Sequence, residues 1–363
     1  MQQKNKRNKT RLTKAQIEDK IAERITEEVI KAMDKGKMPW ECPWDKSACG
    51  LTLPHNITTQ KPYRGGNVFS LMWQGGGSVE FASYKQWAEL GRKYAVSRGE
   101  WEWADKGDGT RWKKPTVYYG VQKGSSSCTA TYYHRNPYLK EKETKAKGED
   151  VFGFSFWLKQ HSVFARTATN IPAPYPAEEW PEPKPFDACE ADLNDAVREY
   201  LMSEELDIRE GGARAYYSPS GDYIGMPPRH AFTEAGGYIH TLTHEAAHST
   251  GHKTREKREF GFMGDDKYAF EELVAEMTAQ ILMRTYGIQV KGMPAEDGWD
   301  ENAIEYLRGW GERFKEKPKE FMRAGRLAQR AVDKILLTEW EEWTDIAIRE
   351  KAKKGATKND EEE

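Results

Sequence analysis

Thr241-Leu-Thr-His-Glu-Ala-Ala-His-Ser-Thr-Gly-His252 decides the fold of the second half of this 363-residue chain, because it contains His244-Glu245-x-x-His248. Side chains four positions apart lie on one face of a helix, so both imidazoles can reach one metal ion. Glu245 would then stand beside the open position of the metal, where a carboxylate acts as general base toward water. The stretch predicts a zinc site of the hydrolase type, with His244 and His248 as ligands and Glu245 as catalytic base.

The flanking residues favour a helix. Gly236-Gly237 precedes the motif and Gly251 follows it, as glycine does just past a last helical turn. Between them, apolar residues recur at helical spacing: Tyr238, Ile239, Leu242, Ala246 and Ala247. The alternative is a chance motif, in which two surface histidines merely flank a glutamate.

A second helical segment, Tyr268 to Leu282, offers the third ligand. Glu272 and Glu276 are four apart and share a face of it. In one class of zinc hydrolases a glutamate on a second helix completes the metal site. An acid one turn later would hydrogen-bond a ligand histidine and fix its tautomer. We therefore expect Glu272 as the third ligand and Glu276 as its supporting acid.

Two other residues compete for the third ligand position. Glu271 is adjacent to Glu272, but the residue four positions after it is Ala275 instead of an acid. His252 follows His248 by four positions, but it would have to reach back past Gly251. Alternatively, the acidic residues of this second segment only form a solvent-exposed face of the helix.

Composition divides the chain into two parts of opposite charge. Residues 1–170 carry 30 Lys and Arg against 18 Asp and Glu, whereas residues 171–363 carry 26 against 40. A basic module commonly binds nucleic acid, so the halves are expected to have different partners. No apolar run is long enough to span a membrane and no secretory signal is visible, so a cytoplasmic location is expected. The four scattered cysteines form no Cys-x-x-Cys pair, which indicates reduced thiols.

The expected fold class is α+β, with a small basic nucleic-acid-binding domain and a mainly helical metallopeptidase-like domain that contains a short antiparallel sheet. A proline-rich stretch marks the boundary, and its prolines favour a stiff extended linker. The predicted division is a basic arm at 1–14, a first domain at 15–170, a linker at 171–186, a second domain at 187–340 and a charged tail at 341–363.

Single-stranded DNA is the nucleic acid expected for the first domain. Bases stack on aromatic rings while cations follow the backbone, and this domain interleaves both residue types over predicted strands at 117–121, 129–133 and 151–157. The alternative is an ordinary α+β core with a basic surface. The candidate DNA contacts come from one turn-rich segment and one short helix: Tyr63, Arg64, Asn67, Lys85, Trp87, Arg92 and Lys93.

Two sets of motifs together resemble the ArdC-type antirestriction family of plasmids and phages. The first half carries Pro39-Trp40, Pro43-Trp44, Asn56-x-x-Thr59-x-x-Pro62-Tyr63-Arg64-Gly65-x-Asn67, Lys85-Gln86 with Gly91, and Val163-Phe164. The second half carries Tyr216-Tyr217-Ser218-Pro219, Asp222-x-Ile224-x-Met226-Pro227, His244-Glu-x-x-His248-x-Thr250-Gly251-His252, Arg255, Phe260-Gly261 and Glu271-Glu-Leu-Val-Ala-Glu276.

This resemblance implies a domain that binds single-stranded DNA, joined to a zincin-like metallopeptidase domain, in a protein that protects incoming mobile DNA from host restriction. His244, His248 and Glu272 then correspond to the metal ligands and Glu245 to the catalytic base. Ala165 departs from the asparagine usual after Val163-Phe164, and residues 95–150 contain inserted charged sequence.

Three functions remain open at this point. The metal domain could be an active peptidase that acts on a restriction enzyme or another DNA-bound protein. It could instead have only a structural role in a DNA-shielding protein. In the third case, the chain is a cytoplasmic metallopeptidase whose basic domain recruits a protein.

Overall fold

The computed structural model describes residues 14–33, 53–135, 156–172, 185–233, 236–261, 265–288 and 313–338. The predicted basic arm, apart from Lys14, and the predicted charged tail lie outside the described residues, as do the Pro-Trp pairs and residues 173–184 of the predicted linker.

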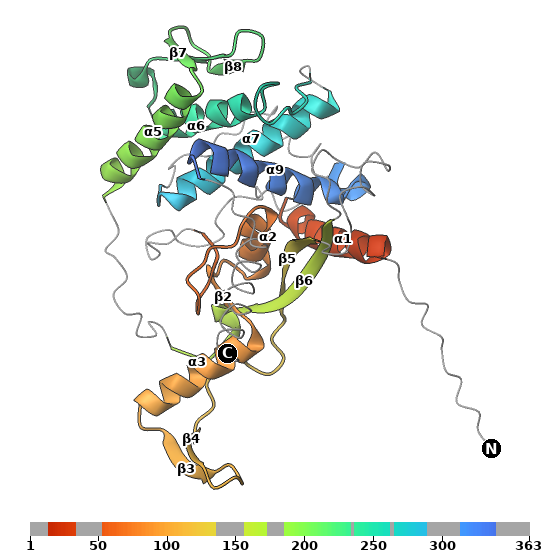
Figure 1. The fold of residues 1–363 in the computed structure, drawn as a ribbon, viewed down its shortest axis with the longest axis vertical. Helices are drawn as coiled ribbons and strands as arrows, with labels where there is room; N and C mark the ends of the chain where they lie inside the picture. Colours follow the sequence, from red (N-terminus) through yellow and green to blue (C-terminus); the bar gives the residue numbers. More distant parts are fainter. Residues whose placement is uncertain are drawn as a thin grey trace, which may run out of the picture.

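The first part of the chain is an α+β unit with two separate sheets (Figure 1). Its helices are α1 (Lys14–Met33), α2 (Gly66–Gln74) and α3 (Tyr84–Ser97), followed later by the 3-10 turn Arg166–Ala168. Its strands are β1 (His55–Asn56), β2 (Glu80–Ala82), β3 (Trp101–Asp105), β4 (Arg111–Pro115), β5 (Cys128–Arg135) and β6 (Phe156–Ala165). Four of them form a sheet in the order β1-β2-β6-β5, and β3 and β4 form a hairpin.

Two of the predicted strands differ from the structure. β5 contains the expected 129–133 segment, but residues 117–121 form only one isolated bridge, between Val121 and Thr169. β6 begins at Phe156, and the start of the predicted 151–157 strand lies outside the described residues.

Local sequence fixes the start of α3. Ser83 is extended and its hydroxyl accepts a hydrogen bond from the backbone of Gln86. In return, the side-chain oxygen of Gln86 accepts one from the backbone N–H of Ser83. This reciprocal pair satisfies the first exposed backbone donors of the helix. The helix then places Trp87 in the core of the domain, where the ring is fully buried.

The second part of the chain is mainly helical, with one small sheet. Its elements are α5 (Phe186–Ser203), β7 (Asp207–Glu210), β8 (Tyr216–Ser218), β9 (Tyr223–Met226), a 3-10 turn (Arg229–Ala231), α6 (Gly237–Thr250), α7 (Asp266–Thr285) and α9 (Lys319–Ile335). β9 lies at the centre of the sheet, parallel to β7 and antiparallel to β8. The antiparallel pair of β8 and β9 agrees with the predicted short antiparallel sheet, and β7 adds a parallel edge strand that was not predicted.

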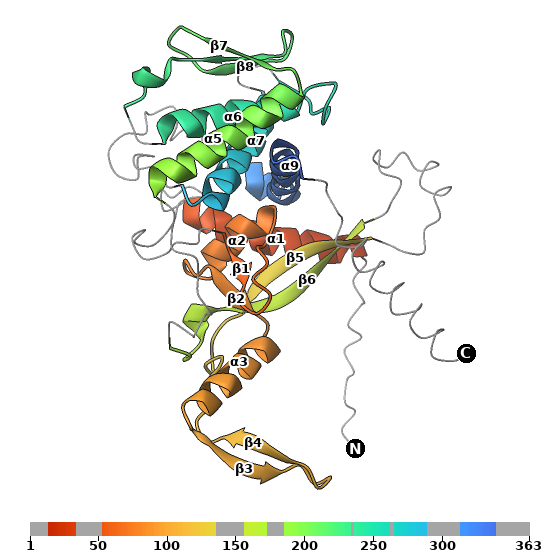
Figure 2. The same ribbon diagram turned by 60° about the vertical axis from the view of Figure 1, so that its left-hand side comes forward.

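The two parts share one hydrophobic core. Ile25 of α1 and Phe69 of α2 belong to the same buried cluster as Leu242 of α6 and Phe321 of α9. Figures 1 and 2 show α9 lying directly against α1 and α2. The stiff linker was expected to keep two domains with separate cores close together. The shared cluster corrects this expectation, because residues of both parts pack in one core. None of the described helices has the length and apolar character needed to span a membrane.

Candidate metal centre and nucleic-acid interface

Helices α6 and α7 pack against each other and carry all the candidate metal-site residues. α6 follows Gly236, whose φ of 80° is left-handed and suits glycine. α7 begins after Asp265, whose carboxylate accepts a hydrogen bond from the backbone of Tyr268. Such a cap satisfies one of the unpaired donors at the helix start.

Three side chains from these helices converge. The Nε2 atoms of His244 and His248 are 3.2 Å apart. The carboxylate of Glu272 lies 3.3 Å from the Nε2 of His244 and 3.5 Å from that of His248. Among the described residues, this trio is the group of donor atoms that could hold a metal ion, with all three atoms within 4.8 Å of one another.

The geometry and chemistry of these donors fit a divalent ion such as zinc. Ligand atoms roughly 2.0–2.1 Å from a tetrahedral ion stand roughly 3.4 Å from each other. The Nε2 atoms are 3.2 Å apart, and each lies at a similar distance from one Glu272 oxygen, 3.3 Å to Oε2 for His244 and 3.5 Å to Oε1 for His248. Two imidazoles and a carboxylate are a ligand set typical of catalytic zinc.

Glu276 orients His244. The Nδ1 of His244 donates to this carboxylate at 3.2 Å, which leaves its Nε2 directed toward Glu272. The same carboxylate accepts from the Nε2 of His240 at 3.2 Å and from Gln280 at 2.9 Å. Glu276 thus lies where the sequence predicted a supporting acid, while His240, four positions before His244, was missed.

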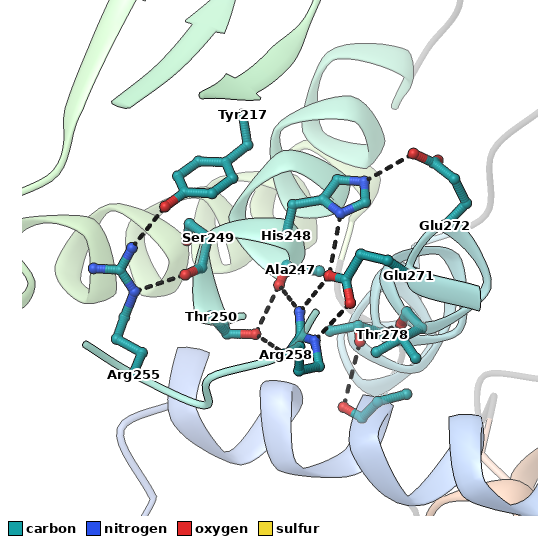
Figure 3. Close-up of polar contacts among 12 residues, drawn as sticks. Tyr217, Ala247, His248, Ser249, Thr250, Arg255, Arg258, Glu271, Glu272 and Thr278 are labelled. Atoms are coloured by element: carbon teal, nitrogen blue, oxygen red, sulfur yellow. Dashed lines mark hydrogen bonds and ion pairs between the residues drawn. The ribbon is translucent and has the colours of Figure 1, made fainter. Parts of the chain in front are cut away.

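Glu271 has the corresponding role for His248, as Figure 3 shows. The Nδ1 of His248 donates to Glu271 at 3.3 Å, and Arg258 donates to both carboxylate oxygens of Glu271 at 2.8 and 2.9 Å. Arg258 also binds the Thr250 hydroxyl and the Ala247 carbonyl at the end of α6. Glu271 therefore contacts the Nδ1 of His248, whereas Glu272 belongs to the trio that could hold a metal ion.

The charges in the site favour ionised carboxylates. Burial opposes ionisation of Glu272, but His244 and His248 outweigh it and lower the carboxyl pKa. Burial also opposes the charge on Glu276, yet His240 and His244 hold its pKa well below the ordinary range. Burial disfavours a protonated His244, but Glu272 and Glu276 raise its pKa to about 10 in the metal-free protein.

Glu245 and Tyr268 complete the site. Glu245 is 7% exposed, on α6 directly after the first ligand histidine. Burial raises the pKa of Tyr268 to about 12, and the charges of Glu272 and Glu245 add to this effect. The sequence analysis missed Tyr268, although its position one turn before Glu272 was a signal.

His252 does not join the metal group. Its Nδ1 is bonded to the Thr254 hydroxyl at 2.8 Å and faces Asp222 at 3.6 Å. Asp222 also pairs with Arg255, which donates to the Ser249 carbonyl at 2.6 Å and to Tyr217 at 3.1 Å (Figure 3). This network ties the small sheet to the end of α6.

Four of the candidate DNA contacts have structural partners. Trp87 is fully buried and donates its indole N–H to the Phe164 carbonyl at 2.8 Å, so it offers no exposed ring for stacking. Asn67 joins α2 to β5 through hydrogen bonds with Thr131. Tyr63 is half-buried and packs edge-on against Phe81.

Arg64 is the fourth, and it bridges the two parts of the chain. Its guanidinium contacts both carboxylate oxygens of Asp333 on α9, at 2.5 and 2.6 Å. The neighbouring backbone N–H of Gly65 donates to the Gln329 side chain at 2.9 Å. The sequence predicted that Arg64 contacts DNA, whereas in the structure its guanidinium is paired with Asp333.

The remaining three candidates are exposed on α3: Lys85, Arg92 and Lys93. Lys93 forms an exposed ion pair with Glu89. A pocket of about 600 Å³ opens beside the start of this helix. Its lining includes Tyr84, Tyr118, Phe164 and Lys123.

Comparison with known families gives one match in each part of the chain. Residues 19–164 match the family described as the N-terminal domain of anti-restriction factor ArdC. Residues 195–327 match the family described as zincin-like metallopeptidase. Fold and site therefore define a two-domain protein with a zincin-like metallopeptidase fold in its second part. The chain belongs to the ArdC-type antirestriction family.

Solved structures agree with this assignment. The chain is similar to the antirestriction protein ArdC from plasmid R388 in its metal-free crystal structure, with 27% identity and a TM-score of 0.58. The match covers 87% of this chain and 96% of ArdC. The Mn(II)-bound structure of the same protein gives 26% identity and the same TM-score.

Curated relatives include proteins of similar and of much greater length. The y4eC protein of Sinorhizobium fredii is 25% identical over 86% of this chain and 90% of its own length. Two DNA primases TraC of Escherichia coli are 31% and 29% identical over 90% and 87% of this chain. The chain spans only 28% and 20% of those primases.

Proposed function

We propose that this protein binds single-stranded DNA through its first domain and carries a zinc-dependent peptidase site in its second. The observation that carries the proposal is the convergence of His244, His248 and Glu272 beside Glu245. When bound, the ion supplies a Lewis acid that activates water and polarises a carbonyl. The R388 structure holds Mn(II), and the two-imidazole, one-carboxylate set makes zinc our choice here.

The residues of the chain divide the work of hydrolysis. His244 and His248 present Nε2, because Glu276 and Glu271 occupy the other ring nitrogens. Glu245 takes a proton from the attacking water and returns it to the leaving amine. We infer that a peptide pairs with β8, an outer strand of the sheet that packs on α6. β9, the last strand before the metal helix, has no free edge, because β7 and β8 pair with it on its two sides.

DNA binding is supported by the charge and family of the first domain. Residues 1–170 carry an excess of 12 positive charges, as 30 basic against 18 acidic residues, and they contain the ArdC N-terminal match. Exposed cations on α3 are placed to contact phosphates. In the cytoplasm, the DNA-bound protein would bring its metal site near a restriction enzyme on the same DNA.

Transfer of an unmodified plasmid into a restricting host tests the whole proposal. Wild type is compared with Glu245→Gln at equal protein level. Glu245→Gln keeps the metal ligands and removes the base, so hydrolysis should be lost while DNA binding remains. We expect protection to survive at least in part, because shielding needs only the first domain.

Complete loss of protection in this variant would show that proteolysis is the mechanism and that shielding alone is insufficient. Full protection with no measurable hydrolysis by wild type would favour the DNA-shielding alternative with a structural metal. Protection without DNA binding by wild type would contradict the proposal and favour recruitment of a protein by the basic domain.

A further inference from the structure

The hairpin β3–β4 contributes no residue to the hydrophobic clusters of the described chain. Among the described strands, β3 and β4 pair only with each other. Figures 1 and 2 show the hairpin beyond α3, at the end of the molecule opposite α6 and α7. An isolated two-stranded hairpin gains little stability by itself, so its sequence is free to serve an interaction.

One face of this hairpin combines aromatic rings with cations. Side chains alternate along a strand, and the register pairs Trp103 with Lys113 and Asp105 with Arg111. Trp101, two positions before Trp103, shares the same face. We call this set, Trp101, Trp103, Arg111 and Lys113, the tryptophan face.

Each ring on the tryptophan face has its own cation. The Nζ of Lys113 lies 4.2 Å from the ring centroid of Trp101, and the guanidinium of Arg111 lies 5.2 Å from that of Trp103. The two rings meet edge-on with centroids 5.3 Å apart. Trp103 is 52% exposed, which is unusual for so large an apolar side chain.

The opposite face is different in charge. There Lys114 forms an ion pair with Glu102 at 3.3 Å, which neutralises its cation. On the tryptophan face the acid is Asp105, whose carboxylate accepts a hydrogen bond from the Gly107 backbone in the turn. The two faces of one hairpin therefore offer a matched pair of lysines, Lys113 beside a ring and Lys114 beside an acid.

We propose that the tryptophan face binds single-stranded DNA, with bases stacked on Trp101 and Trp103 and phosphates held by Arg111 and Lys113. This inference rests on the proposed DNA binding of the first domain and gives it a specific site. A nucleotide replaces both existing contacts at once, since its base takes the ring and its phosphate takes the cation. Duplex DNA keeps its bases stacked internally, so the same face prefers unpaired strands.

The hairpin continues the exposed cationic surface of α3. Arg92 and Lys93 lie on the helix that leads directly into β3. The base of the hairpin is closed by the backbone of Thr116, which donates to the Glu100 carbonyl at 3.0 Å. The cations of α3 and the tryptophan face are therefore neighbours along the chain, separated by a few residues.

Fluorescence anisotropy of a labelled oligothymidine with the full chain tests this site. Trp103→Ala should weaken binding roughly tenfold, the loss of one stacked base, and Trp103→Tyr should recover most of it. Lys113→Ala should reduce the slope of log K against log salt by about 0.7, the contribution of one phosphate on a single strand. Lys114→Ala, which removes the same charge from the opposite face, should leave that slope unchanged.

The outcomes separate this site from the proposed function. If wild type fails to bind the oligothymidine, the proposed DNA binding of the first domain is refuted. If wild type binds, and Trp101→Ala, Trp103→Ala and Lys113→Ala all bind equally well, the domain binds DNA elsewhere and the tryptophan face is refuted. Equal losses for Lys113→Ala and Lys114→Ala would also refute it, because only a nonspecific charge effect would remain.

Discussion

Glu276 and Glu271 each fix one ligand histidine, and their partners differ. Glu276 also serves His240, whereas Glu271 is held by Arg258. Both acids leave the Nε2 atoms free to face Glu272. The metal site is therefore built as two carboxylate–histidine pairs, each anchored by a further cationic or imidazole group.

Removing either supporting acid should weaken metal binding without abolishing it. Glu276→Gln and Glu271→Gln are each expected to lower the affinity for zinc about 10- to 100-fold, because the ring orientation and basicity of one ligand are lost. Competition with a chelating dye measures this. Glu259→Gln, which changes an exposed acid in an ion pair with Lys267, is the matched control and should bind as wild type. Equal affinity in all four proteins would contradict the assigned roles.

Metal binding should release protons. The pKa of His244 is raised from 6.5 to about 10 in the metal-free protein, so near neutral pH the site keeps a proton that the ion must displace. Affinity for zinc should therefore fall as the pH is lowered. By the same sign, the stability from protonated His244 is fully present below pH 6.5 and is lost as the pH rises through about 10.

Calorimetry in buffers of different ionisation enthalpy counts the protons released per metal bound. The expected result at pH 8 is a clear dependence of the observed heat on the buffer. A heat independent of the buffer would show that the free site is already deprotonated.

Much of this site follows from spacing alone. His244 and His248, like Glu272 and Glu276, share a face because they are four apart on helices, and helical geometry does not depend on the rest of the fold. Arg258 could not be found this way, because it reaches Glu271 from a loop through tertiary packing. Trp87 shows where a sequence pattern misleads. Its segment is rich in basic and aromatic residues, which predicted a DNA contact, but its side chain is fully buried in the core.

At the scale of elements, α9 approaches α2 closely through glycines. A Cβ on Gly325 would lie 2.4 Å from the backbone nitrogen of Gly66 and 2.5 Å from its Cα. Backbone atoms cannot move aside as a flexible side chain can, so this contact requires glycine on α9.

Gly325→Ala should therefore destabilise the protein by about 1–3 kcal/mol through overpacking. In an exposed helix the same change would stabilise by up to about 1 kcal/mol, so the sign is diagnostic. Thermal unfolding of Gly325→Ala and of the exposed neighbour Arg326→Ala measures the difference. An unfolding temperature for Gly325→Ala at or above that of wild type would contradict the close packing.

Arg64 provides the polar contact between the same elements. Its partner Asp333 is a mostly buried carboxylate, so Arg64→Ala should cost about 1–3 kcal/mol of stability. The change removes both guanidinium contacts and leaves Asp333 the hydrogen bond from Gln329. Arg92→Ala, an exposed cation on α3, should cost much less and should instead reduce DNA affinity. Chemical denaturation of both variants distinguishes a packing residue from a surface contact; equal stability would contradict this division.

Pairing of strands was harder to predict than helices. α6 and α7 begin and end within a few residues of the expected positions. The hairpin β3–β4 lies within residues 95–150, which were expected only as inserted charged sequence, because its tryptophans alternate with charged residues. β7 was missed for a related reason, since its short polar sequence forms a strand only by pairing with β9.

At the scale of the whole molecule, the chain unites a basic domain and an acidic one through a common core. The charge division was visible in the sequence. The two family matches, over residues 19–164 and 195–327, lie on either side of the proline-rich stretch. The shared core was not visible, because it depends on α1 and α2 meeting α9, and contacts between these regions join residues 269 to 292 positions apart. DNA binding should therefore be measured on the full chain, since a fragment ending at residue 170 would lose part of its core.

Elemental analysis of the purified full chain and three variants tests the central claim, a single metal centre on α6 and α7. We expect one zinc per chain in wild type and in Glu245→Gln, which retains all three ligands. We expect loss of zinc in the His244→Ala/His248→Ala double variant and severe depletion in Glu272→Ala. Full zinc occupancy in the double histidine variant, with the fold intact by circular dichroism, would contradict the account.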